Sequence, residues 1–414
     1  MKHLVPTSML VFGSLMSLYA ENGGSIAATS QDPCCPKPCP PKPCCVPVCC
    51  PEIVEDCCAY YHCPPTTQVT PNVVPNVQNG ANLFITAAFT YWTAHEDGLA
   101  FANVEPDFGF VGAAPSGLRV GSTTTAVPNF KWKPGFKVGA GFNFCHDGWD
   151  LYFDYTWFRS TNNQRSLSVA LDSFNDISDG YWLVNAPYIQ DILGDFSLYR
   201  IDLYESASAN WSVKWNIFDL ELGRNFYISR RLKLRPHFGL KGMFARQTLD
   251  VNFNIFEGAD LAATSSMNNQ IKNWGIGVRA GLDAAWHFSE SFSMIGEISA
   301  TGLWEQFKVS RLDQTQFFLT TDFGTANVLG VAGDIPSTVN YQSNLYFLRP
   351  VLEWFLGLRW EMWTCEESFR FEFDAGWETQ VWFSQNQFLR IQGAEADHGD
   401  LSFAGLTVRA RFDF

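Results

Sequence analysis

The chain has 414 residues, of which 15% are aromatic and only 17% are charged. Soluble proteins average about 25% charged residues, while 36 Phe, 15 Trp and 13 Tyr require burial, which excludes disorder over the whole length. The net charge of −14 has the wrong sign for nucleic-acid binding, so we expect no such partner. Beyond the first 20 residues no apolar run reaches the roughly 18 residues of a membrane-spanning helix.

The N-terminus predicts export from the cytoplasm. Lys2 and His3 precede a mostly apolar stretch, Leu4 to Leu18, and the small residue Ala20 follows it. This arrangement is typical of a secretory signal peptide over residues 1–20, with cleavage after Ala20. The mature chain then enters a compartment in which disulfides persist.

Residues 21–81 form a cysteine- and proline-rich extension that we expect to be disordered, because its composition cannot build a packed core. Neighbouring cysteines pair with difficulty, so more distant partners are expected. We favour cross-links to other cysteine-rich envelope proteins or to copies of the same chain. Internal disulfides and a thiolate metal site with His62 are the alternatives, and irregular spacing in an oxidising compartment argues against the metal. The candidate cross-linking residues are Cys34, Cys35, Cys39, Cys44, Cys45, Cys49, Cys50, Cys57, Cys58 and Cys63.

Residues 82–414 alternate apolar and polar residues with a period of two. In one run Phe369, Phe371 and Phe373 alternate with Arg370 and Glu372. Several runs keep phase for 12 or more residues, whereas soluble strands average about 5–6 and a tilted bilayer-crossing strand needs about 9–11. Aromatic residues also cluster at the ends of the runs, as membrane interfaces require. We therefore predict an all-β fold, a closed transmembrane antiparallel β-barrel; a secreted sandwich or soluble barrel explains neither feature as well.

Short and long connections between the runs follow each other in turn. Counting the runs that lie between these connections gives about ten strands. The long connections leave room for hidden hairpins, so 12–16 strands stay open. Short turns are typical of the periplasmic side, and an even number puts both termini there. In the fourth strand the apolar parity changes between Ile217 and Phe218, which predicts a bulge. The predicted spans are 82–92, 130–144, 149–159, 206–228, 231–245, 271–288, 291–308, 344–363, 368–383 and 402–414.

The last predicted strand ends the chain on an aromatic residue. Phe412 and Phe414 share its apolar face. This is similar to the C-terminal signal that the outer-membrane assembly machinery reads by adding an edge strand. We therefore expect the barrel-assembly machinery and outer-membrane lipid as partners.

The hairpin Gly139–Phe158, GAGFNFCHDGWDLYFDYTWF, resembles the major outer membrane protein family of Legionella and similar proteins of amoeba-associated relatives of chlamydiae. A glycine-rich strand, a tight turn, Gly148-Trp149-Asp150 and an aromatic strand carry the match. The ending at Phe414 agrees with it. The resemblance extends over residues 82–414 and implies an abundant porin-like barrel exposed to host cells. The cysteine-rich extension departs from the family pattern.

No catalytic motif is found, so we expect neither an enzyme nor a cofactor. If the apolar parity faces lipid, the opposite parity points charged residues into the lumen, where they would set pore selectivity. They are Lys131, Lys133, Lys137, Asp150, Asp154, Lys233, Arg235, Lys241, Arg279, Asp283, Glu353, Arg359, Arg370, Glu372, Asp374, Arg409 and Arg411.

Two functions remain open at this point. The first is passive diffusion of small hydrophilic solutes through a bacterial outer-membrane porin that also supports the envelope through disulfides. The alternative is a non-conducting structural or adhesive barrel that contacts host cells, with the lumen charges forming a salt-bridge network. Ten strands enclose little free space, so the strand count bears directly on this choice.

Overall fold

The computed structural model describes residues 77, 80–104, 109–111, 118–120, 124–144, 147–168, 181–183, 206–257, 260–317, 335–364, 369–389 and 399–414. The predicted signal peptide, the ten clustered cysteines, Cys145 and Cys365 lie outside these residues. Within the described residues no helix is long and apolar enough to cross a membrane.

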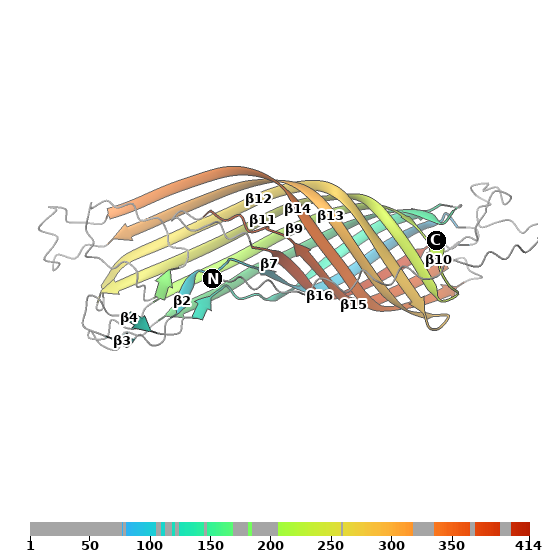
Figure 1. Cartoon of the computed structure of the whole chain (residues 1–414), viewed down its shortest axis with the longest axis horizontal. Coiled ribbons are helices and arrows are strands. Elements are labelled where there is room, and N and C mark those ends of the chain that lie inside the picture. Colours follow the sequence, from blue (N-terminus) through green and yellow to red (C-terminus); the bar gives the residue numbers. More distant parts are fainter. Residues whose placement is uncertain are drawn as a thin grey trace, which may run out of the picture. The chain divides into compact units, whose positions relative to one another are not determined.

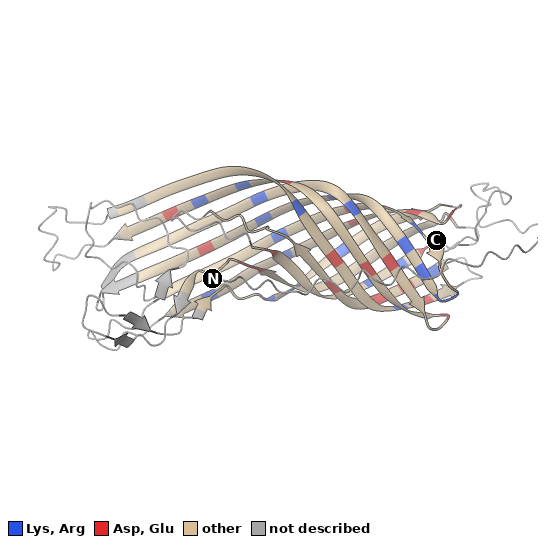
Figure 2. Cartoon of the chain, viewed as in Figure 1, with Lys and Arg blue, Asp and Glu red and all other residues tan. Residues whose placement is uncertain are grey.

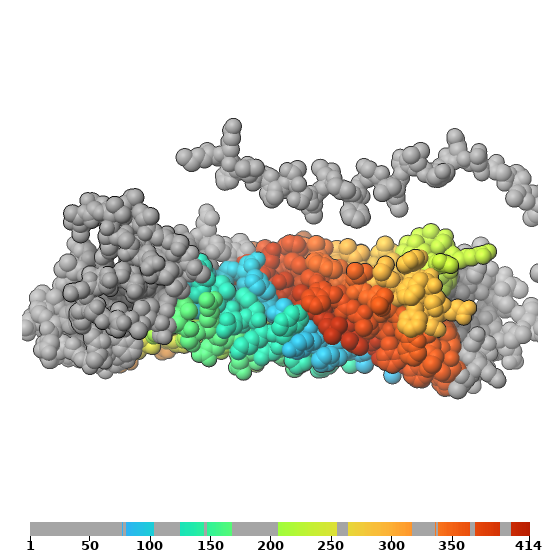
Figure 3. All heavy atoms as spheres, turned by 90° about the horizontal axis from the view of Figure 1, so that it is seen from below, coloured from blue at the N-terminus to red at the C-terminus, as the bar shows by residue number. Residues whose placement is uncertain are grey.

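Ten strands form one antiparallel sheet that closes on itself (Figure 1). Each strand pairs with its neighbour along the chain, the first pairs with the last, and the ring closes between β9 and β11. Figure 3 shows the blue first strand lying against the red C-terminal strands. The strands are β1 (Leu83–Glu96), β6 (Trp132–Asn143), β7 (Trp149–Ser168), β9 (Ser206–Arg224), β11 (Leu232–Glu257), β12 (Asp260–His287), β13 (Phe292–Phe317), β14 (Ile335–Thr364), β15 (Phe369–Trp382) and β16 (Leu401–Asp413).

The predicted barrel and its ten strands are confirmed, but several strands are longer than expected. The stretch 246–270 is not a long loop, because β11 and β12 continue through it to a register shift between Ile255 and Phe256. Strand β14 likewise begins at Ile335 rather than 344. Strands β11 to β14 each have between 26 and 30 residues, more than twice the 12 residues of β6.

Short strands lie outside the ring. Strand β2 (Ala102–Val104) pairs with both β5 (Thr124–Ala126) and β8 (Tyr181–Leu183), and β3 (Gly109–Val111) pairs with β4 (Leu118–Val120). Strand β10 (Phe226–Tyr227) pairs with β11. We call the end of the barrel that holds β10 and the C-terminus the turn end, and the opposite end the loop end (Figure 1). Asn82 also lies at the turn end, because it precedes Leu83, which hydrogen-bonds to Phe414.

An apolar belt surrounds the turn-end half of the barrel. On β12 it runs from Trp274 to Trp286, whose side chains are 43% and 47% exposed on the outer surface. On β1 its loop-end limit is Tyr91, which stacks on Trp132. Aromatic residues at both edges are typical of a membrane belt, so these outward side chains mark the membrane-spanning part of each strand.

Beyond the belt, toward the loop end, the polarity of the two faces is reversed. On β12 the outward residues become Lys272 and Gln270, while Ile271 and Met267 are fully buried inside the barrel. On β12 the sheet there has apolar side chains inside and polar side chains outside, which is the reverse of the belt.

This reversal corrects the predicted bulge in β9. Pairing of β9 with β7 and with β11 is continuous through Ile217 and Phe218, without a register shift. Ile217 points inward and Phe218 outward because the surroundings change at that level. The register shift that the structure does show next to β9 lies in β7, between Ser160 and Asn163.

Candidate functional site

The turn-end half of the lumen is a chamber lined by charged side chains from all parts of the ring. Its free space is a cavity of about 180 Å³. The glycines of β6 make room for bulky neighbours: a Cβ on Gly141 would lie 2.1 Å from the Phe84 ring, and one on Gly139 would lie 2.6 Å from the Tyr152 hydroxyl. The bulky side chains packed against these glycines therefore narrow the chamber.

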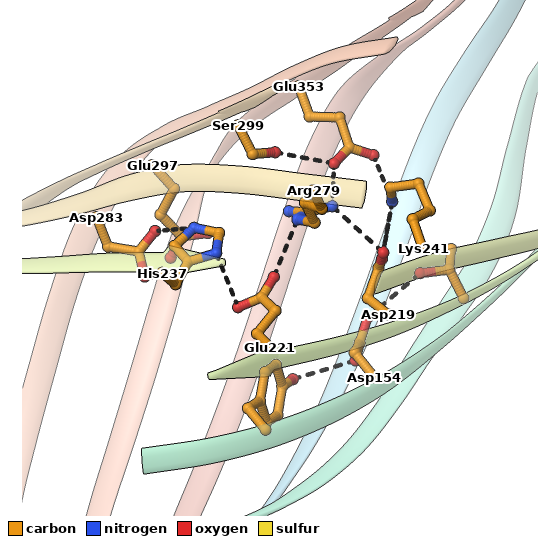
Figure 4. Close-up of polar contacts among 12 residues, drawn as sticks. Asp154, Asp219, Glu221, His237, Lys241, Arg279, Asp283, Glu297, Ser299 and Glu353 are labelled. Carbon is orange, nitrogen blue, oxygen red and sulfur yellow. Dashed lines mark hydrogen bonds and ion pairs between the residues drawn. The ribbon is translucent and has the colours of Figure 1, made fainter. Parts of the chain in front are cut away.

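Lys241 points into the lumen and is fully buried. Its Nζ is 2.7 Å from Asp219 and 3.0 Å from Glu353, both on other strands (Figure 4). Arg279 binds the same two carboxylates and also lies 3.1 Å from Glu221. A buried charge is stable only when it is paired and hydrogen-bonded, and this group satisfies that requirement with three acids and two bases.

A second group of ion pairs surrounds Arg235. Its guanidinium lies 2.6 Å from Asp150 and 2.7 Å from Asp283. His237 lies 3.5 Å from both Glu221 and Asp283 (Figure 4). These contacts join β7, β9, β11 and β12 across the turn end of the lumen.

A third group lies on the opposite wall, formed by β14, β15 and β16. Arg359 contacts Asp374 and Glu372 at 2.8 Å each. Arg370 contacts Glu372 at 2.6 Å, and Arg409 contacts Asp374 at 2.7 Å. The Asp374 side chain is only 1% exposed. Each of these charges is therefore paired with a charge of opposite sign on the wall of the chamber.

An aromatic layer covers the chamber on its loop-end side. Trp92, Trp215, Trp382 and Phe403 point inward from four strands and are at most 1% exposed. The Trp215 and Trp382 rings are 5.0 Å apart and meet edge to face. Lys241 lies 5.7 Å from the Trp382 ring, so the layer rests directly on the charged chamber.

The segment Ser384–Leu389, between β15 and β16, folds into the loop-end interior. Gln385 is fully buried, and its Nε2 donates to both carboxylate oxygens of Glu305 at 2.9 Å. Its Oε1 accepts from Asn273 at 3.1 Å. The Leu389 carbonyl accepts from Arg311 at 2.8 Å. We call this segment the inner segment; it ties β12 and β13 to the connection that leaves β15.

Glu96 is buried in the loop-end interior, five residues beyond the belt limit on β1. Its surroundings include Trp211 and Gln247, which hydrogen-bond to each other at 3.2 Å. Burial raises the pKa of Glu96 to about 8, and its two polar neighbours offset only part of that effect. At neutral pH the side chain is therefore mostly protonated.

Most of the residues predicted to face the lumen line this chamber. Lys131 instead precedes β6 and is exposed, and Lys133 lies opposite Trp92, beyond the chamber. Lys241 and Asp374 are buried in the ion-pair groups described above. The chamber is lined by Lys137, Asp150, Asp154, Lys233, Arg235, Arg279, Asp283, Glu353, Arg359, Arg370, Glu372, Arg409 and Arg411.

Several important residues were not predicted. Asp219 and Glu221 were hidden by the parity change in β9, and the inner segment was assigned to a loop. The aromatic layer did have a signal in the sequence, because four apolar residues of the fourth predicted strand share one parity: Trp211, Val213, Trp215 and Ile217.

At the C-terminus, Phe412 stacks on Phe369 at 5.7 Å, and Phe414 exchanges backbone hydrogen bonds with Leu83.

A family model described as the Legionella pneumophila major outer membrane protein precursor matches residues 73–414. The chain belongs to this family. The match covers the whole barrel and confirms the resemblance carried by the Gly139–Phe158 hairpin. Family and fold together make the chain an outer-membrane β-barrel protein. Among curated proteins none matches the sequence.

Solved structures give only distant similarities. The Escherichia coli outer membrane protease OmpT is 9% identical, with a TM-score of 0.33, over 84% of this chain and 99% of that chain. A Pseudomonas aeruginosa FadL homologue is 8% identical, with a TM-score of 0.25, over 84% and 95%. The Pseudomonas putida toluene transporter TodX is 7% identical, with a TM-score of 0.25, over 83% and 92%. Similarities this low carry no argument about function.

Proposed function

We propose that this chain is a structural outer-membrane barrel that is closed at rest and strengthens the cell envelope. The observation that carries the proposal is the buried aromatic layer of Trp92, Trp215, Trp382 and Phe403 over a chamber of paired charges. A solute crossing the barrel would have to displace both. We propose no catalytic activity and no cofactor.

The turn end faces the periplasm in this proposal. Support comes from the tight connections there, such as Ser289 and Glu290 between β12 and β13, since short turns are typical of the periplasmic side. The Phe412 and Phe414 rings lie at the same end, where the assembly machinery would read them. The long connections then face outward and are available for contact with a host-cell surface.

The cysteine-rich extension supplies the envelope function in this proposal. Ten cysteines between Cys34 and Cys63 precede a barrel whose first strand starts at the turn end. Disulfides to other cysteine-rich envelope proteins, or to further copies, would join the outer membrane to the layer beneath it. Native envelopes should therefore show this chain in high-mass bands that collapse to the monomer with reductant. A monomer without reductant would exclude these cross-links.

Passive diffusion is the second candidate function, favoured by the polarity of the chamber. Its turn-end charges are partly wet: the side chains of Asp283, Glu297 and Arg409 are between 24% and 28% exposed. Small hydrophilic solutes would thus find a polar entrance at one end. Passage would require movement of the inner segment and of the aromatic layer.

A liposome swelling assay separates the two functions. Proteoliposomes that contain the full-length barrel are diluted into isotonic arabinose, and swelling is followed by light scattering. The closed barrel predicts a rate equal to that of protein-free liposomes at every protein-to-lipid ratio. A rate that rises in proportion to inserted protein would favour the porin. Heat-modifiable migration on gels confirms that the barrel is folded in both cases.

A further inference from the structure

Five basic residues lie side by side on five neighbouring strands of the barrel. Arg159 of β7 is paired with Lys214 of β9, and Lys214 with Arg246 of β11. Arg246 is paired with Lys272 of β12, and Lys272 with Lys308 of β13. We call these five residues the cationic row. Blue residues on successive strands near the middle of the barrel can be followed in Figure 2.

The row faces outward, directly beyond the apolar belt. Lys214, Arg246, Lys272 and Lys308 are exposed. The next outward residue toward the turn end is aromatic on three of the strands, namely Trp157, Phe244 and Trp274. The row therefore lies at the level where lipid headgroups meet water on the loop-end side of the membrane.

No carboxylate of the described residues forms an ion pair with any member of the row. The Arg159 guanidinium donates hydrogen bonds to the carbonyl of Trp215 at 2.7 Å and to Oδ1 of Asn216 at 2.8 Å. It also lies over the Trp157 ring. Like charges directly opposite each other on paired strands destabilise a sheet. Within the described residues the row thus repeats an unfavourable pairing four times, and this repulsion would be relieved by bound anions.

We propose that the cationic row binds the phosphate groups of anionic lipid headgroups in the leaflet at the loop end. Lys and Arg are the side chains that bind phosphate most strongly, and basic clusters beside membrane spans attract anionic lipids. Five strands extend over roughly 19 Å at the usual strand spacing, which suits more than one phosphate.

A membrane lipid fits this site better than free phosphate does. Exposed aromatic side chains next to the row, such as Phe244 at 56% and Trp274 at 43%, offer an apolar surface for acyl chains. A phosphorylated lipid contacts both surfaces at once, whereas inorganic phosphate contacts only the basic side chains. In a bacterial outer membrane the matching chemistry is a glycolipid with phosphates on its sugar headgroup. The proposal does not depend on whether the lumen conducts.

The test measures lipid binding to the full-length barrel in detergent, with bisphosphorylated lipid A and its dephosphorylated form as probes. Lys272→Gln with Lys308→Gln removes two adjacent charges of the row. Arg230→Gln with Arg231→Gln is the matched control, because it removes two exposed charges at the turn end. Native mass spectrometry measures the affinity of each protein for each of the two lipids.

Each membrane-surface cation contributes about fivefold to binding, so the row variant should bind bisphosphorylated lipid A at least tenfold more weakly than wild type. The control should bind as wild type does, and the dephosphorylated lipid should bind all proteins weakly. Equal losses in both variants would overturn the proposal, as would equal affinity for the two lipids. Inorganic phosphate that competes at the concentration of the lipid phosphate would overturn the assignment to a lipid.

Discussion

Ile217 and Phe218 are neighbours in β9, yet they face different media. Ile217 is 1% exposed inside the barrel, and Phe218 is 37% exposed on its outer surface. Their backbones pair without interruption with Met243 and Gly242 of β11. At the level of this residue pair the belt ends, and the inward side chains of β9 change from acidic, Asp219 and Glu221, to apolar. The proposed closure lies at the same level.

Lysine substitutions at these two positions should have very different effects. Ile217→Lys places a charge without a partner in a dry interior, and we expect a loss of at least about 3 kcal/mol of stability. Phe218→Lys lies at the edge of the belt, where the expected cost is about 0–1 kcal/mol. Urea unfolding of the refolded barrels in lipid, followed by gel migration, gives both values. A well-tolerated Ile217→Lys would indicate water at this level and hence an open lumen.

Lys241 should be important for stability rather than for solute passage. Lys241→Met removes the charge while Asp219 and Glu353 remain buried, and breaking a buried pair costs about 3–5 kcal/mol. Arg231→Met, at an exposed turn position, is the control and should change the free energy of unfolding by less than about 0.5 kcal/mol. A double-mutant cycle with Asp219→Asn should show strong coupling. Additive effects in that cycle would contradict the ion pairing of Lys241 with Asp219.

The inner segment should close the loop end through Gln385. Gln385→Glu sets a carboxylate against Glu305 in place of two hydrogen bonds, each worth about 1.5–3 kcal/mol to a charged acceptor. We expect brief channel openings in bilayer recordings that become more frequent as the pH rises and the two neighbouring acids ionise. The additional substitution Glu305→Gln exchanges the positions of the carboxylate and the amide, and it should restore closure. Openings of equal frequency in the single and double variants would show that the segment does not control access.

Glu96 predicts a pH dependence of stability. Its pKa is about 8 in the folded barrel and 4.5 in an ordinary environment, so folding takes up a proton between these values. Stability therefore falls as the pH rises from 4.5 through 8. The melting temperature of the wild type should be lower at pH 9 than at pH 6, and Glu96→Gln should flatten this profile. Parallel profiles for the two proteins would contradict the assignment.

The barrel could be predicted from the sequence because lipid imposes strict alternation on the belt. Residues such as Trp274 and Trp286 identify both edges of the membrane on one strand. The same rule failed beyond the belt, where an apolar residue points inward and a polar one outward. There the alternation of β11 and β12 continues with inverted polarity, and the sequence pattern was interpreted as a loop.

The lumen could be predicted only as a set of inward charges. Alternation identifies Lys241 as inward-facing, but it contains no information on which acid the amine meets across the ring. The pairing with Asp219 and Glu353 depends on strand number and register, and both are properties of the closed sheet. The inner segment was out of reach for a similar reason, since Gln385 finds Glu305 only after the barrel has formed.

The most direct test of the closed lumen is the conductance of the purified full-length barrel in planar lipid bilayers. Insertion is verified independently by protease protection in the same lipid. A closed lumen predicts no conductance steps above the baseline for the wild type in roughly 1 M KCl, where surface charges are screened within about 3 Å. Stable, uniform conductance steps from a folded, inserted wild type would contradict it.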